Sequence, residues 1–199
     1  MILTGPEIRR QHAAGKITLE PFSLEQVNPN SYNYRLGPTL RRFTGLNDAQ
    51  EPVFETIRIP DDGYVLEPGR MTLGHTAEVI GSSSFAMSLI GRSSIGRLGL
   101  FLQVSADLGH TTSVHQWTLE LVAAKPIRIY AGMRIGQVSF WVNEGRIRKY
   151  KGFYGTQNAP TPSRLHAQHD GRGVSPPPGH VQRAAASTFR PSACRPLRA

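Results

Sequence analysis

Short strand-like segments follow one another along most of this chain, and they constrain its fold more than any other feature. They recur about every ten residues, are rich in β-branched, aromatic and leucine residues, and are separated by Gly or Pro turns. The segments read SYNYRL, TLRRF, ETIRI, YVLEP, MTLGHTAEVI, SFAMSLI, LFLQVSA, QWTLELVA, IRIYA and RIGQVSFWV. Such spacing is typical of an all-β sandwich or barrel. The sequence therefore predicts an all-β protein with little helix.

One short helix is expected at the N-terminus, in the stretch TGPEIRRQHAAGKI. Thr4 can serve as its N-cap, Pro6 suits its first turn, and Gly15 is placed to end it. No second segment carries a comparable helical signal.

The chain of 199 residues suggests one domain, which we place at residues 1–165. Residues 166–199 are rich in Pro, Ala and Arg and are expected to be a disordered basic tail, because such a composition cannot bury enough apolar surface to fold. The formal net charge of +9 suits an anionic ligand. Because no basic motif interleaved with aromatic residues stands in the tail, we expect no specific nucleic-acid partner.

The single cysteine, Cys194, excludes a disulfide framework within the chain and a cysteine-held zinc. No stretch approaches the length of apolar residues that spans a bilayer. These observations favour a cytoplasmic protein without a membrane partner.

The segment IGRSSIGRLGL, residues 90–100, places two arginines and two serines between hydrophobic residues. A buried arginine is costly unless a carboxylate or an anionic ligand pairs with it. Gly91, Ser93 and Ser94 could turn backbone N–H groups and hydroxyls toward one anion, while Arg92 and Arg97 supply charge. On composition alone, a turn with structural arginines is favoured over such an anion site.

The segment WTLEL, residues 117–121, alternates as a strand does. Trp117, Leu119 and Leu121 should share one face, and Thr118 and Glu120 the other. Most strand glutamates point to water, so the pattern alone does not assign Glu120 a function.

Taken together, GRSSIGRLGL, then VSA at residues 104–106, then TLEL at residues 118–121 resemble the dCTP deaminase family of the trimeric dUTPase-like superfamily. The resemblance extends to NPNSYNYRLG, LEPGRMTLGHTAE, IYAGMRIGQVSF and YGTQNAPTPSR, and so covers nearly all of residues 1–164. It implies a distorted jelly-roll β-barrel of the dUTPase-like type. It also implies a homotrimer whose active sites are shared between subunits.

The resemblance implies four catalytic residues. Glu120 matches the glutamate that activates water for attack on C4 of cytosine and carries protons to the leaving amine. Ser93 and Arg97 match residues that position the water and the base, and the Ala106 carbonyl matches one that holds the water and the amino group. The side chains expected to contact the nucleoside triphosphate are Arg92, Ser94, Ser105, His110, Tyr150, Tyr154 and Gln157.

The chemistry implied for these residues needs no metal held by the protein. Zinc deaminases carry a His-x-Glu and Pro-Cys-x-x-Cys signature, which is missing from the sequence. His110 and His115 lie near each other without a convincing third ligand, so no metal site is predicted. A carboxylate base and fixed dipoles can replace the metal, and Mg²⁺ is expected only with the triphosphate.

The chain departs from the family pattern between residues 107 and 116. His110 stands where the family has an aspartate that contacts the deoxyribose 3′-hydroxyl, and Thr111 and Thr112 replace Pro-Gly. Asn33 replaces a frequent aspartate, and Phe153 stands where a lysine is expected. In relatives that hydrolyse dUTP, that aspartate also acts as the base for the attacking water. Because this chain has His110 in its place, we expect poor hydrolysis of dUTP, and therefore deamination of dCTP to dUTP and ammonia.

Two alternatives remain open from the sequence. A bifunctional dCTP deaminase and dUTP diphosphatase is favoured by the C-terminal APTPSR and opposed by His110. A non-catalytic nucleotide-binding regulator would keep the arginine and serine residues but would not need Glu120.

Overall fold

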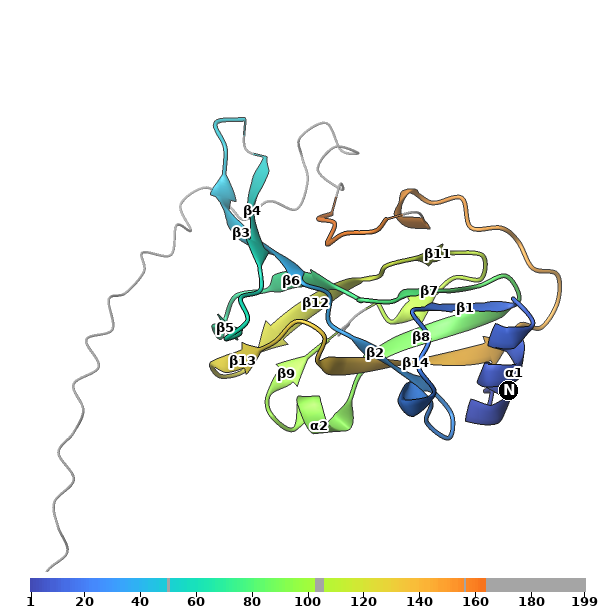
Figure 1. The fold of residues 1–199 in the computed structure, drawn as a ribbon. Helices are drawn as coiled ribbons and strands as arrows, with labels where there is room; N and C mark the ends of the chain where they lie inside the picture. Colours follow the sequence, from blue (N-terminus) through green and yellow to red (C-terminus); the bar gives the residue numbers. More distant parts are fainter. Residues whose placement is uncertain (50, 103–105, 156, 164–199) are drawn as a thin grey trace, which may run out of the picture.

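The computed structural model describes residues 1–49, 51–102, 106–155 and 157–163. In these residues four antiparallel sheets enclose one hydrophobic core (Figure 1). The domain boundary expected near residue 165 and the tail at 166–199 lie outside the described residues.

The sheets contain strands that are far apart in the sequence. The first has the order β1 (Ile17–Glu20), β7 (Val79–Ser82) and β11 (Val114–His115), and the second β10 (Leu108–Gly109), β8 (Phe85–Gly91), β14 (Arg134–Val142) and β2 (Tyr32–Arg35). The third has the order β4 (Pro52–Arg58), β3 (Thr39–Leu46), β6 (Thr72–His75), β12 (Thr118–Ala123) and β9 (Leu100–Phe101), and the fourth pairs β13 (Ile127–Ile129) with β5 (Tyr64–Leu66). The predicted all-β, distorted jelly-roll class is confirmed.

The N-terminal helix is confirmed as α1 (Gly5–Ala13). Thr4 has the extended backbone of an N-cap, but its side chain makes no capping hydrogen bond. Gly15 follows the helix end with a φ of 69°. Three shorter helical turns are α2 (Ser93–Gly96), η1 (Leu24–Gln26) and η2 (Phe153–Gly155).

The central pair of strands, β8 and β14, shows how alternation builds the core. They run antiparallel from Gly136 opposite Gly91 to Val142 opposite Phe85. Met87 and Leu89 on β8 and Val138 and Phe140 on β14 are fully buried. One face of each strand therefore packs inward, as period-two patterning requires.

The strands β3 and β4 form a hairpin that projects from the body of the molecule (Figure 1). A register shift between Phe43 and Gly45 marks a bulge in it. None of the helices in the described part of the chain is long and apolar enough to cross a membrane.

Candidate active site

Glu120 lies in the middle of β12, directly opposite Leu73 of β6. Leu119 and Leu121 are fully buried, whereas Thr118 and Glu120 on the opposite face of the strand are partly buried. The alternation predicted from the sequence is confirmed. The carboxylate therefore belongs to a face that remains accessible to a ligand.

The C-terminal described segment returns to this face of β12. The Thr161 N–H donates a hydrogen bond of 3.1 Å to the Thr118 hydroxyl oxygen, and the Gln116 N–H donates one of 3.2 Å to the Asn158 side-chain oxygen. Figure 1 shows the segment leaving β14, passing around the edge of the molecule and returning above β11. Residues 157–163 are thus held beside the strand that carries Glu120.

Gln157 and Tyr154, which the resemblance places in contact with phosphates, belong to the same segment. Gln157 is partly buried, and its side-chain nitrogen is buried without a hydrogen-bond partner among the described residues. Buried amide nitrogens are nearly always satisfied, so this one is a candidate ligand contact. Tyr154 is exposed.

Arg92, Ser93, Ser94 and Arg97 gather on the single turn α2, which is anchored by the buried Ile95. Both serines and Arg97 are exposed, and Arg92 is partly buried. Within the described residues, no carboxylate pairs with either arginine, and the four side chains make no hydrogen bond. The charge on α2 is therefore not neutralised by any described carboxylate and can bind an anionic ligand.

The structure links α2 to β12 through the backbone but does not join α2 to Glu120. The strand β9 pairs with the C-terminal end of β12, and the Ala124 N–H donates to the Gly99 carbonyl at 2.8 Å. The α2 side chains make no hydrogen bond or ion pair in the described chain, so neither Arg92 nor Arg97 pairs with Glu120 within the described residues of one copy.

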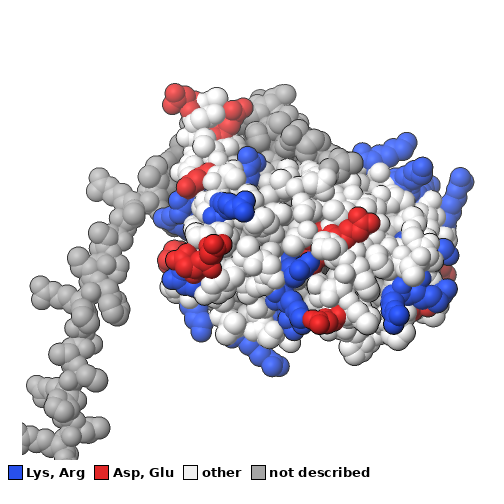
Figure 2. All heavy atoms as spheres, in the orientation of Figure 1, with Lys and Arg blue, Asp and Glu red and all other residues white. Residues whose placement is uncertain are grey.

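The structure does bring together His110 and Tyr150. Their rings stack with centroids 5.0 Å apart and an interplanar angle of 19°. They line a groove of about 560 Å³ together with Arg146, Arg148 and Lys149. Figure 2 shows basic side chains gathered at the upper right of the molecule, where this segment runs in Figure 1.

The groove contains residues to which the sequence reasoning gave no role. Thr112, also beside the groove, has a φ of 76°, the one non-glycine residue with positive φ in the described chain. The sequence contained a sign of this conformation, because Thr112, a β-branched residue, replaces the glycine of a Pro-Gly pair. The alternating cations of RIRKYK were a second signal.

Two expected site residues are less informative. Ser105 lies outside the described residues, and Ala106 is exposed just before β10. Their predicted contacts to water and substrate stay predictions.

Two buried histidines lie near the start of β12. His75 pairs with Thr118 across the sheet. The His115 ring packs against the Trp117 ring, with centroids 4.2 Å apart and the planes tilted by 31°. Each ring places Nδ1 within hydrogen-bond distance of the next residue's carbonyl, 2.9 Å for His75 and 2.8 Å for His115. Burial lowers the pKa of both histidines, so both are neutral near pH 7.

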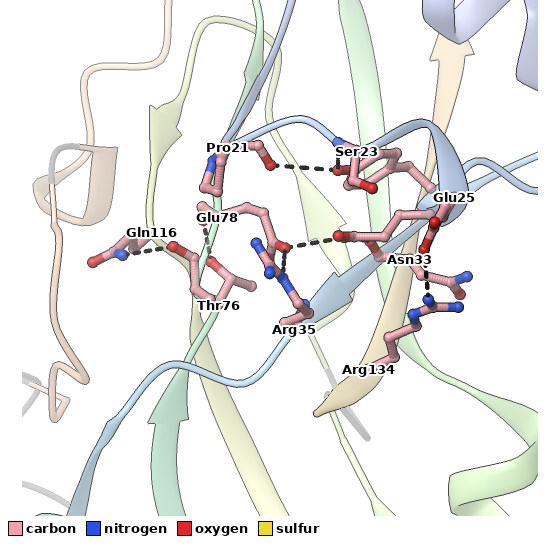
Figure 3. Close-up of polar contacts among 12 residues, drawn as sticks. Pro21, Ser23, Glu25, Asn33, Arg35, Thr76, Glu78, Gln116 and Arg134 are labelled. Atoms are coloured by element: carbon pink, nitrogen blue, oxygen red, sulfur yellow. Dashed lines mark hydrogen bonds and ion pairs between the residues drawn. The ribbon is translucent and has the colours of Figure 1, made fainter. Parts of the chain in front are cut away.

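A buried ion pair supports the same region (Figure 3). Glu78 is completely buried and accepts hydrogen bonds from Arg35 Nε at 2.7 Å, from the Arg35 backbone N–H at 2.8 Å and from Gln26 at 3.0 Å. Asn33, also buried, donates to the Asn28 side chain at 3.2 Å. We read these contacts as structural, because the one buried carboxylate is fully paired. No group of three potential metal ligands is found among the described residues.

The sequence of the chain matches a known protein family over most of its length. Residues 2–143 match the family model described as dCTP deaminase-like. The chain belongs to the dCTP deaminase-like family. The resemblance drawn from its motifs is confirmed, and with it the expectation of an enzyme of this class.

Curated relatives match over most of their length. A protein of Leptospira biflexa serovar Patoc, named dCTP deaminase, dUMP-forming, is 39% identical over 169 residues, which cover 83% of this chain and 97% of the relative. A protein of Hathewaya histolytica with the same name is 40% identical over 168 residues, with the same coverage.

A solved structure supports the fold. The crystal structure of 2′-deoxycytidine 5′-triphosphate deaminase from Agrobacterium tumefaciens matches with a TM-score of 0.59 and 23% identity. The match covers 71% of this chain and 48% of that chain, so this chain spans about half the length of the solved one.

Proposed function

We propose that this chain deaminates dCTP hydrolytically, using Glu120 as the base. The observation that carries the proposal is the half-buried Glu120 on β12, beside the returning segment, in a chain of this family. A glutamate in a partly buried site suits proton transfer at neutral pH.

The proposed reaction begins with a water held against C4 of cytosine. Glu120 takes a proton from this water, and the new C–O bond gives a tetrahedral intermediate. Glu120 then returns the proton to the amino nitrogen, the C–N bond breaks, and ammonia leaves. Ser93, Arg97 and the Ala106 carbonyl would position the water and the base, with no metal held by the protein.

The product that we propose differs from the expectation based on His110. Both relatives are named dUMP-forming, which conflicts with dUTP as the product. We therefore include a second step, in which water attacks the triphosphate of dUTP and releases dUMP and diphosphate. The sum is dCTP and two waters giving dUMP, ammonia and diphosphate, with Mg²⁺ bound to the phosphates.

We also propose that the site is completed by a second copy of the chain in a homotrimer. Support comes from α2, whose cations have no carboxylate partner among the described residues of one copy, and from large apolar side chains exposed near it. Leu98 follows α2, Ile90 precedes it, and Phe101 lies on β9. Exposed apolar side chains grouped in this way are typical of interfaces.

The test is incubation with the mono-, di- and triphosphates of cytidine and deoxycytidine. Ammonia and diphosphate are measured separately. We expect both from dCTP, in equal amounts. Ammonia without diphosphate would contradict the second step, and tight nucleotide binding with neither product would favour a non-catalytic regulator.

A further inference from the structure

The turn at residues 110–113 has a conformation that its own residue types do not favour. Thr112 has a φ of 76°, and a β-branched side chain in the left-handed region is strained. Its N–H donates to the Ser82 carbonyl at 2.7 Å, and the Ser113 N–H donates to the His110 carbonyl at 3.2 Å. Glycine would adopt this φ without strain, so the hydroxyl must contribute something that glycine cannot.

The contribution visible in the structure is a pair of contacts to the segment after β14. The Tyr150 N–H donates to the Thr112 hydroxyl oxygen at 2.9 Å. At the other end, the Asn143 side chain donates to the Thr111 hydroxyl oxygen at 2.9 Å. Two successive threonines therefore hold both ends of residues 143–150.

The held segment faces His110 across the groove with an excess of positive charge. The groove of about 560 Å³ is lined by four cations, Arg146, Arg148, Lys149 and Lys151, and by one carboxylate, Glu144. None of these cations pairs with a carboxylate among the described residues. Cations gathered in a concave site attract an extended anion such as a phosphate chain.

We propose that Thr112 is a positioning residue, which latches the basic segment 146–151 against His110 so that the groove takes the phosphate chain of the nucleotide substrate. The choice of nucleotide rests on the proposed function. Thr112 acts through its hydroxyl oxygen, which accepts the hydrogen bond from the Tyr150 N–H. This bond keeps Tyr150 stacked on His110, and the two stacked rings form one side of the groove.

Three substitutions of Thr112 separate latching from folding. Thr112→Val removes the hydrogen-bond acceptor at constant shape, Thr112→Ser keeps it, and Thr112→Gly removes it while relieving the strained φ. We expect the Val and Gly variants to bind inorganic tripolyphosphate about tenfold more weakly by calorimetry, and to raise KM for dCTP by a similar factor with a much smaller change in kcat. The Ser variant should stay close to the wild type.

The glycine variant gives the sharpest comparison, because its thermal midpoint should equal or exceed that of the wild type while its binding weakens. Lys149→Gln should weaken tripolyphosphate binding, and Arg9→Gln on α1, outside the groove, should not. A Thr112→Gly variant that binds tripolyphosphate as the wild type does would overturn the proposal. If the wild type binds tripolyphosphate through the groove but releases no ammonia from dCTP, the proposed function fails and the latch stands.

Discussion

Arg97 ends α2 with an exposed guanidinium that no carboxylate of the described chain neutralises. A side chain in this position contributes little to folding, since it has no partner to lose. It can contribute much to binding, because charge-assisted hydrogen bonds to phosphate are strong and geometrically specific. Function and stability should therefore separate at this residue.

Arg97→Ala is expected to raise KM for dCTP at least about tenfold, the loss typical of one hydrogen bond to a charged group. The free energy of unfolding in urea should change by no more than about 0.5 kcal/mol, as for exposed residues in general. Steady-state kinetics and urea titration measure the two effects. Arg58→Ala on β4 is the matched control, and an Arg97→Ala enzyme with unchanged KM and kcat would remove Arg97 from the site.

The two buried histidines make stability depend on pH. Burial lowers the pKa of His75 and of His115, so below pH 6.5 the unfolded chain binds protons that the folded chain refuses. Their stabilising contribution is complete above pH 6.5 and decreases as the pH falls toward the folded-state pKa values. The urea midpoint should decrease as the pH is lowered from 7 to 5. In the His115→Gln variant this decrease of the midpoint should be smaller. An identical pH profile in that variant would show that His115 titrates freely in the folded state.

At the scale of strands, the sequence was most informative where the middle of a long strand faces the core. The segment 134–142 was predicted and found with the same bounds, because a turn precedes it and its burial alternates. The segment 71–80 is instead two strands, since Thr76 bonds to Trp117 and Glu78 and turns the chain into another sheet. Its composition gives no sign of that break. The two-residue strands β10 and β11 were missed, because only pairing with distant strands defines them.

A close approach between β2 and β6 gives a prediction at this scale. A Cβ on Gly37 would lie 2.2 Å from the buried His75 ring, and the Gly37 N–H donates to the His75 carbonyl at 2.7 Å. Gly37→Ala should therefore destabilise the protein by about 1–3 kcal/mol. Gly96→Ala in α2, where nothing lies within 4 Å, is the control and should be neutral or slightly stabilising. Equal urea midpoints for the two variants would contradict this account of the contact.

At the scale of the whole molecule, the motifs predict which residues form the site but not how those residues meet. Glu120 and the returning segment come together within one copy, as do His110 and Tyr150. No ion pair joins the α2 cations to Glu120 among the described residues, and the sequence carries no signal for which copy of the chain completes the site. Local sequence patterns predict strands and turns. Assembly into oligomers depends on surfaces that the whole fold creates, so local patterns do not predict it.

Mixing two impaired variants, assayed at a dCTP concentration well below KM, tests the shared site. If Glu120 of one subunit works with Arg97 of another, random trimers of Glu120→Gln and Arg97→Ala chains contain intact sites, about a quarter of the total. Activity near that fraction should return after the two proteins are unfolded together and refolded. A refolded mixture no more active than the average of its two components would place both residues of each site in one copy.

The central claim is that the Glu120 carboxylate makes water reactive, and the most direct measurement is ammonia release from dCTP by Glu120→Gln. We predict a loss of at least about a hundredfold in kcat, the effect of removing a general base. Binding of dCTP, followed by calorimetry, should change only slightly, because glutamine keeps the shape of the side chain. Ammonia release at the wild-type rate would contradict the claim.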